Sequence, residues 1–216
     1  MTPRSRALLA ALAAAALGAA ATPARATFVA DPNPGGDKMY IDAAHHGASG
    51  FLGYVGANDP SGDHVGIAAN APVDTGSGYA NITPSGGGPL TTLTFAPAND
   101  TLFGDFSFRG QLNRAGYTGT LDVLWTDSLG VSGTVEFTNL PAEADFGRIG
   151  IHSTDGETLK SVEIRTTDAE SFKEVKEIDF SYAPESPTPV PEPASLGVLC
   201  AGLAGLLGAQ RRRSAL

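Results

Sequence analysis

The sequence predicts an all-β protein: an antiparallel β-sandwich flanked by an N-terminal signal helix and a C-terminal transmembrane helix. Three observations lead to this prediction. Residues 7–21 form an apolar run, residues 196–209 form an uncharged run followed by arginines, and the chain between them alternates apolar and polar residues in short segments. Alternation with a period of two is typical of strands with one buried face, whereas apolar runs beside basic residues at chain ends are typical of export and membrane signals.

Residues 1–26 have the three-part organisation of a secretory signal peptide. Arginines precede the apolar run, and Ala24 and Ala26 supply the small side chains that a signal peptidase requires before the cleaved bond. The mature protein is therefore expected to begin at or near Thr27, with signal peptidase as a partner. An Ala-rich helix of a cytosolic protein is the alternative interpretation.

The body, residues 27–183, is expected to form one secreted β-sandwich domain. Strands are predicted where apolar side chains share one parity, in residues 90–96, 102–109, 120–126, 131–138, 146–152, 159–165 and 177–182. Turn-forming residues fall between these segments. Seven or more such strands fit two antiparallel sheets packed face to face.

Two parts of the body depart from this pattern. Phe172, Val175 and Ile178 recur every three residues, which is compatible with one helical turn. Residues 31–89 are rich in Gly, Pro and Asp, so we expect a few strands there, joined by long surface loops and packed less well than the rest.

The charge and cysteine content exclude several classes of function. Residues 27–193 hold all 23 acidic residues and 8 of the 14 basic ones, which gives this part a formal charge of −15. Phosphate contacts need a basic patch, so nucleic acid is not an expected partner. Cys200, the one cysteine, lies in the C-terminal uncharged run, so we expect neither a disulfide nor a Cys–zinc site in the body.

No catalytic, cofactor or metal site is recognisable in the body. The histidines at 45, 46, 64 and 152 lack metal-ligand spacing and are expected as solvated loop residues, and no G-x-S-x-G elbow occurs. Carboxylates are numerous, so a glycosidase pair stays open, but the one tryptophan, Trp125, shares the parity of core residues. Residues 58–63 (NDPSGD) are the best calcium candidate, with an ordinary turn as the alternative.

Behind the body we predict a Pro-rich linker, residues 184–193, and a transmembrane helix with a basic tail, residues 194–216. As a helix, the 14 uncharged residues span about 21 Å, which is shorter than the ~30 Å hydrocarbon core. Arg211, Arg212 and Arg213 can snorkel and lengthen the effective span. Because arginine clusters stay cytoplasmic, these three are the predicted cytoplasmic stop and the body is exported.

Pro191, Glu192 and Pro193, followed by the short helix and the arginines, resemble the PEP-CTERM sorting signal of Gram-negative bacteria. In that family a membrane protease, exosortase, recognises a Pro-Glu-Pro motif, a short transmembrane helix and a basic cluster. The resemblance implies an exosortase partner, transient anchoring in the inner membrane, cleavage near the motif, and release to the cell surface or matrix. A stiff linker to a permanent anchor is the alternative. The end of the body is also loosely similar to the final strands of extracellular jelly-roll domains.

The sequence therefore predicts an exported, non-catalytic surface or extracellular-matrix protein, structural or associated with the exopolysaccharide of a biofilm. The alternative is a secreted glycan-active hydrolase with an unrecognised carboxylate pair. A permanently anchored periplasmic protein is a third possibility.

Overall fold

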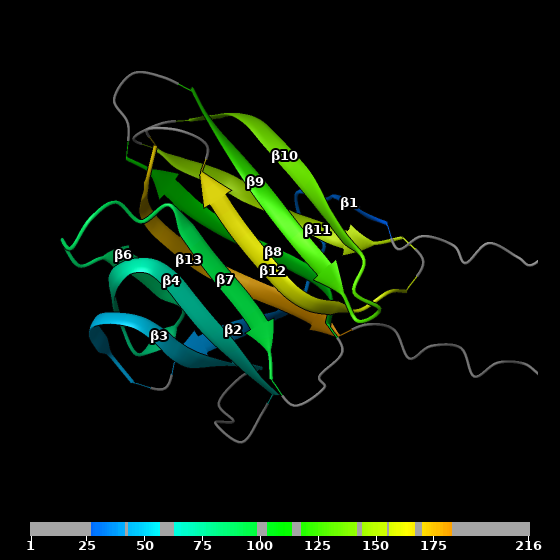
Figure 1. The fold of residues 1–216 in the computed structure, drawn as a ribbon, viewed down its shortest axis with the longest axis horizontal. Helices are drawn as coiled ribbons and strands as arrows, with labels where there is room; N and C mark the ends of the chain where they lie inside the picture. Colours follow the sequence, from blue (N-terminus) through cyan, green and yellow to red (C-terminus); the bar gives the residue numbers. More distant parts are fainter. Residues whose placement is uncertain are drawn as a thin grey trace, which may run out of the picture.

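The computed structural model describes residues 27–41, 43–56, 63–98, 103–113, 118–141, 144–154, 156–166 and 170–182. These residues form strands joined by antiparallel pairs, with no helix among them (Figure 1). The strands are β1 (Phe28–Ala30), β2 (Asp37–Ile41), β3 (His45–Val55), β4 (Asp63–Thr75), β5 (Gly78–Tyr79), β6 (Asn81–Pro84), β7 (Thr92–Pro97), β8 (Phe103–Leu112), β9 (Thr118–Asp127), β10 (Ser132–Pro141), β11 (Asp145–Ser153), β12 (Leu159–Thr166) and β13 (Phe172–Tyr182). The predicted all-β, antiparallel architecture is confirmed.

The flanking helices predicted for residues 1–26 and 194–216 lie outside the described residues. Within the described ranges, no helix is long and apolar enough to span a membrane.

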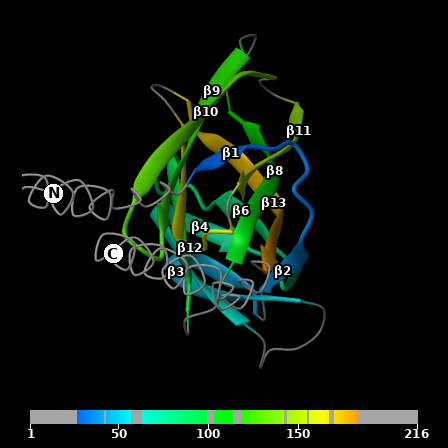
Figure 2. The same ribbon diagram turned by 90° about the vertical axis from the view of Figure 1, so that its right-hand side faces the viewer.

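The strands pack as two layers around one core (Figure 2). One layer runs β1-β11-β8-β13, and the other runs β4-β7-β12-β9-β10. β2 and β3 connect the layers along one side, where β6 also pairs with both β13 and β4. β1 and β10 end the strand order on the opposite side.

Phenylalanines from both layers meet in the centre of the core. Phe95 of β7 lies 5.3 Å from Phe106 of β8, and Phe103 lies 4.8 Å from Phe180 of β13, as measured between ring centroids. All four side chains are fully buried. Aromatic pairs at these separations contribute about 0.5–1.5 kcal/mol each beyond the buried area, and the body has no cysteine to add a disulfide. Packing therefore stabilises the domain.

Trp125 lies in the core, as its parity predicts. It is 7% exposed, and its ring centroid lies 4.8 Å from that of Phe28 in β1. Gly133 is its partner across the β9–β10 ladder, and a Cβ at that position would collide with the indole ring. The glycine therefore leaves the space that the tryptophan fills.

Residues 31–89 contain the few strands expected there, but the prediction that they pack less well than the rest is wrong. This region forms β2 to β6, including the 13-residue β4, and Met39, Val65 and Ile82 are fully buried. Some of its glycines lie in irregular strand positions rather than loops. Gly47, with φ of 64°, lies within β3 where its register against β4 shifts. A residue type that favours turns also serves in bulges.

The helical turn considered around Phe172 is also absent, because residues 172–182 form β13. Its register against β8 shifts between Phe172 and Glu174 and again between Lys176 and Asp179. Each bulge adds one residue, so buried side chains recur after three positions instead of two. Phe172, Val175 and Ile178 are all fully buried in this way.

Candidate functional site

The sequence-predicted processing residues lie outside the described part of the chain. These are Ala24 and Ala26 at the signal cleavage site, Pro191, Glu192 and Pro193 in the sorting motif, and Arg211, Arg212 and Arg213 at the stop. The folded domain itself carries two features of interest, a polar groove and an ionic cluster.

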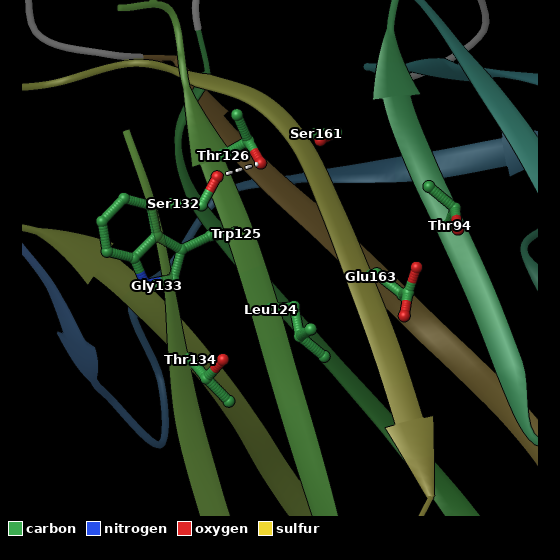
Figure 3. Close-up of a pocket in the computed structure, with 9 residues that line it drawn as sticks. All are labelled: Thr94, Leu124, Trp125, Thr126, Ser132, Gly133, Thr134, Ser161 and Glu163. Atoms are coloured by element: carbon green, nitrogen blue, oxygen red, sulfur yellow. Dashed lines mark hydrogen bonds between the residues drawn. The ribbon is translucent and has the colours of Figure 1, made fainter. Parts of the chain in front are cut away.

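The polar groove lies across β7, β12, β9 and β10 and has a volume of about 370 Å³ (Figure 3). Strand register builds it from two cross-strand rows. One row runs Thr94, Glu163, Leu124 and Thr134, and the other runs Ser161, Thr126 and Ser132. The hydroxyls of Thr126 and Ser132 are hydrogen-bonded at 2.9 Å.

The chemistry of the groove is hydrogen bonding. Its hydroxyls can donate and accept, whereas Glu163 is the only ionisable side chain among its lining residues. A glycosidase site uses two carboxyl groups about 5–10 Å apart, which this lining does not supply. Trp125 also lines the groove, but its burial leaves little ring face for stacking on a sugar.

The ionic cluster, defined by Arg109, Arg148, Glu177, Asp179 and Tyr79, is assembled by two bulges. Arg148 lies where β11 shifts register against β8, between Phe146 and Ile149. Glu177 lies in the second bulge of β13, with the left-handed φ of 49°. Bulges re-aim side chains, and a positive φ at a non-glycine residue carries strain that neighbouring contacts must offset.

Arg148 is the centre of the ionic cluster. Its guanidinium is ion-paired with Asp179 and with Glu177, where Nη2 lies 3.4 Å from Oε2. It also donates to Ser107 Oγ at 3.0 Å and to the Glu177 carbonyl at 3.2 Å. One side chain of β11 thus reaches across β8 and fastens β13.

The remaining members of the ionic cluster also pair with the two carboxylates. Arg109 Nη1 lies 3.2 Å from Glu177 Oε1, and the Tyr79 hydroxyl donates to Asp179 Oδ1 at 2.7 Å. The Lys38 ammonium lies 4.7 Å from the centre of the Tyr79 ring. Burial raises the pKa of Asp179, and the hydrogen bond from Tyr79 and the charge of Arg148 offset this only in part. Both carboxylates are occupied by counterions, which favours a role in strand fastening over acid–base chemistry.

Near the start of the fold, Asp31 and Asp105 flank His152. His152 Nδ1 lies 3.3 Å from Asp31 Oδ2, and His152 is the cross-strand partner of Asp105. Burial raises the pKa of Asp105, against hydrogen bonds from the Ser153 backbone and the Ser181 side chain.

This shift predicts a pH dependence for the Asp105→Asn variant. When folding raises the pKa of a carboxyl group, the protein loses stability as the pH rises from the ordinary pKa of 3.8 through the raised pKa. The stability of Asp105→Asn relative to the parent should therefore increase across that window and then level off. Urea unfolding between pH 3 and pH 7 measures this.

Asp145→Asn is the matched control with the opposite sign. Its hydrogen bond from Lys176 lowers the pKa of Asp145, so the parent gains stability as the pH rises towards 3.8. The relative stability of that variant should therefore fall as the pH rises to 3.8 and stay level above it. Parallel curves for the two variants would contradict both assignments.

The histidines lie on strands, so their predicted loop placement is wrong. His45 and His46 belong to β3, His64 to β4 and His152 to β11. His45 stacks on Phe51 with centroids 5.0 Å apart, whereas the His46 side chain is 83% exposed. Among the described residues, no three His, Cys, Asp or Glu side chains are arranged to hold a metal ion. Of the calcium candidate 58–63, only Asp63 is described.

Comparison with known proteins identifies a sorting signal in the C-terminal residues of the chain. The family described as "PEP-CTERM protein-sorting motif" matches residues 189–213, which contain the Pro-Glu-Pro motif and the three arginines. The chain therefore carries a PEP-CTERM sorting signal, as its resemblance predicts, and this signal implies an exported protein that an exosortase processes.

The folded body has no comparable match. No curated protein matches the chain. The chain is similar to the crystal structure of the bacteriophage CBA120 tailspike protein 4 enzymatically active domain, with 9% identity and a TM-score of 0.29 over 73% of this chain and 19% of that one. A similarity of this extent carries no argument about the body.

Proposed function

We propose that this is an exported, non-catalytic component of the cell surface or extracellular matrix, built as a jelly-roll-like sandwich and released from the inner membrane by an exosortase. The observation that carries the proposal is the PEP-CTERM signal at residues 189–213, behind a folded domain that ends with β13 at Tyr182. The body would act as a structural or exopolysaccharide-associated unit after release.

The spacing between domain and motif suits this processing. Eight residues, 183–190, separate Tyr182 from Pro191. A segment of eight residues can span up to about 25 Å in a polyproline II conformation, at ~3.1 Å per residue. A spacer of this length leaves room for a protease to reach the motif.

The polar groove supports association with a polysaccharide. Its two rows of hydroxyls and Glu163 offer donors and acceptors to sugar hydroxyl groups. The formal charge of −15 on residues 27–193 disfavours strongly anionic polymers and favours neutral ones.

Mass spectrometry of the secreted protein tests the processing. The expected chain begins at or near Thr27 and ends near Pro191–Pro193. In cells that lack the exosortase, the chain should keep its C-terminus at Leu216. Secreted protein that retains residues 196–216 in exosortase-positive cells would contradict the proposal.

Replacing single carboxylates by amides tests the non-catalytic role. Glu163→Gln should leave the matrix phenotype of the cells intact, and so should Glu177→Gln wherever its melting curve shows a folded protein. Loss of the phenotype in a folded single-carboxylate variant would favour a hydrolase.

A further inference from the structure

We propose that the tethered precursor stands end-on to the membrane, with the β9–β10 hairpin resting on the bilayer surface through Leu129. The contacting end, named here the tail-side end, is where β1 begins and β13 ends. This inference rests on the proposed function, because it needs the chain to be held by its C-terminal segment before cleavage.

Strand register brings the hairpin and the end of the domain together. Tyr182, the last residue of β13, is the cross-strand partner of Phe103, Phe103 pairs with Leu159 of β12, and Leu159 pairs with Asp127 at the end of β9. One continuous row therefore joins the exit of the chain to the base of the hairpin. In Figure 1 the arrowheads of β9 and β13 point to the same end of the molecule.

The start of the domain lies at this end as well. Ser181 pairs with Asp105, Asp105 with His152, and His152 with Val29 of β1. The Thr27 carbonyl accepts a hydrogen bond from the backbone N–H of Thr154 at 3.1 Å. Both ends of the described chain thus leave the fold at one end of the sandwich.

The same end carries most of the exposed apolar side chains. Four large hydrophobic side chains are exposed in the described residues, and three of them are Leu129 (81%), Val131 (37%) and Tyr182 (45%). The fourth, Leu52, is 54% exposed on β3. Exposed leucine and tyrosine side chains are typical of surfaces that insert into a bilayer interface.

The hairpin holds Leu129 outward in a defined conformation. Asp127 Oδ1 accepts the backbone N–H groups of Leu129 at 2.9 Å and Val131 at 2.7 Å. Gly130 donates its N–H to the Asp127 carbonyl at 3.0 Å and has φ of 83°. These bonds fix the backbone of the four-residue tip, so little backbone freedom remains to be lost when the leucine inserts.

The spacer keeps the domain near the membrane, and charge selects the lipid. The eight residues between Tyr182 and the motif span at most about 25 Å, so the tail-side end is held within that distance of the motif. Acidic groups lie at the tail-side end, including Asp63, whose hydrogen bond with Tyr182 contributes, after burial, to raising the pKa of Tyr182 to about 12. A zwitterionic surface is therefore the expected partner, and anionic lipid should weaken the contact.

Fluorescence quenching on the full chain tests the orientation. With Cys200→Ser as background, a dye is attached through Ser128→Cys beside Leu129 or through Thr118→Cys at the opposite end of β9. Each chain is inserted into phosphatidylcholine vesicles that carry a nitroxide-labelled lipid. We expect quenching at position 128 and none at position 118.

The role of Leu129 is tested in the chain labelled at position 128. Leu129→Ser should abolish the quenching, whereas Leu52→Ser, which alters an exposed leucine of β3 outside the hairpin, should leave it unchanged. Equal quenching at both labels, or quenching that survives Leu129→Ser, would overturn the inference. Flotation separates this from the proposed function: chains that float with vesicles but show no quenching refute only the orientation, whereas chains that do not float refute the tether itself.

Discussion

Replacing Arg148 by methionine is expected to lower the free energy of unfolding by about 3 kcal/mol, at the lower end of the range for breaking a buried ion pair. The methionine fills much of the volume but leaves Asp179, whose side chain is 11% exposed, without its cation. Ser107 Oγ and the Glu177 carbonyl also lose a donor. Urea unfolding monitored through Trp125 fluorescence measures the change.

Arg109→Met is the matched control. Arg109 is 36% exposed and reaches only the carboxylate of Glu177 within the ionic cluster. Exposed ion pairs contribute about 0–1 kcal/mol, so this variant should remain close to the parent. An Arg148→Met variant that is no less stable than Arg109→Met would show that the cluster does not fasten the strands.

The pH dependence and a double variant identify the unpaired charge as the cause. Without Arg148, the pKa of Asp179 should rise further above its already raised value, so the loss of stability should be largest at neutral pH and shrink as the pH falls and Asp179 becomes protonated. Arg148→Met combined with Asp179→Asn should recover much of the loss, because no buried charge is left uncompensated.

All seven segments that the sequence predicts as strands fall in strands of the fold, β7 to β13. Residues 120–126 and 159–165 lie in β9 and β12, and their apolar positions, Leu121, Val123, Val162 and Ile164, are fully buried. One misreading occurs where bulges change the spacing of the buried side chains. In β13 the three-residue recurrence imitates a helix, and only the pairing with β8 distinguishes the two.

The ionic cluster shows a second limit of local patterns. Arg148, Glu177 and Asp179 are ordinary charged residues when read along the chain, and the register of β11, β8 and β13 alone brings them together. The three-residue intervals from Phe172 to Val175 and from Val175 to Ile178 are the signals that the chain gives of the two bulges. The sorting signal was predictable because its motif, uncharged run and arginines are contiguous, so no tertiary contact is needed to recognise it.

Replacing Arg211, Arg212 and Arg213 together by serine is expected to abolish processing of the tail. Each arginine costs about 2.5–3.5 kcal/mol to move to the bilayer centre, so three together oppose translocation by far more than thermal energy. The 14 uncharged residues before them are half Gly and Ala, which offer too little apolar surface to stop export unaided. The serine variant should therefore be exported with its C-terminus at Leu216, as mass spectrometry of the secreted chain would show.

The triple lysine variant separates charge from geometry. Lysine keeps the positive charge but lacks the planar guanidinium fork. If charge alone holds the segment in the membrane, this variant should be cleaved as the parent is. If exosortase requires the guanidinium, the lysine variant should stay membrane-bound and uncut, an outcome that flotation distinguishes from the exported serine variant. Normal cleavage of the serine variant would mean that the uncharged run is held in the membrane without its arginines.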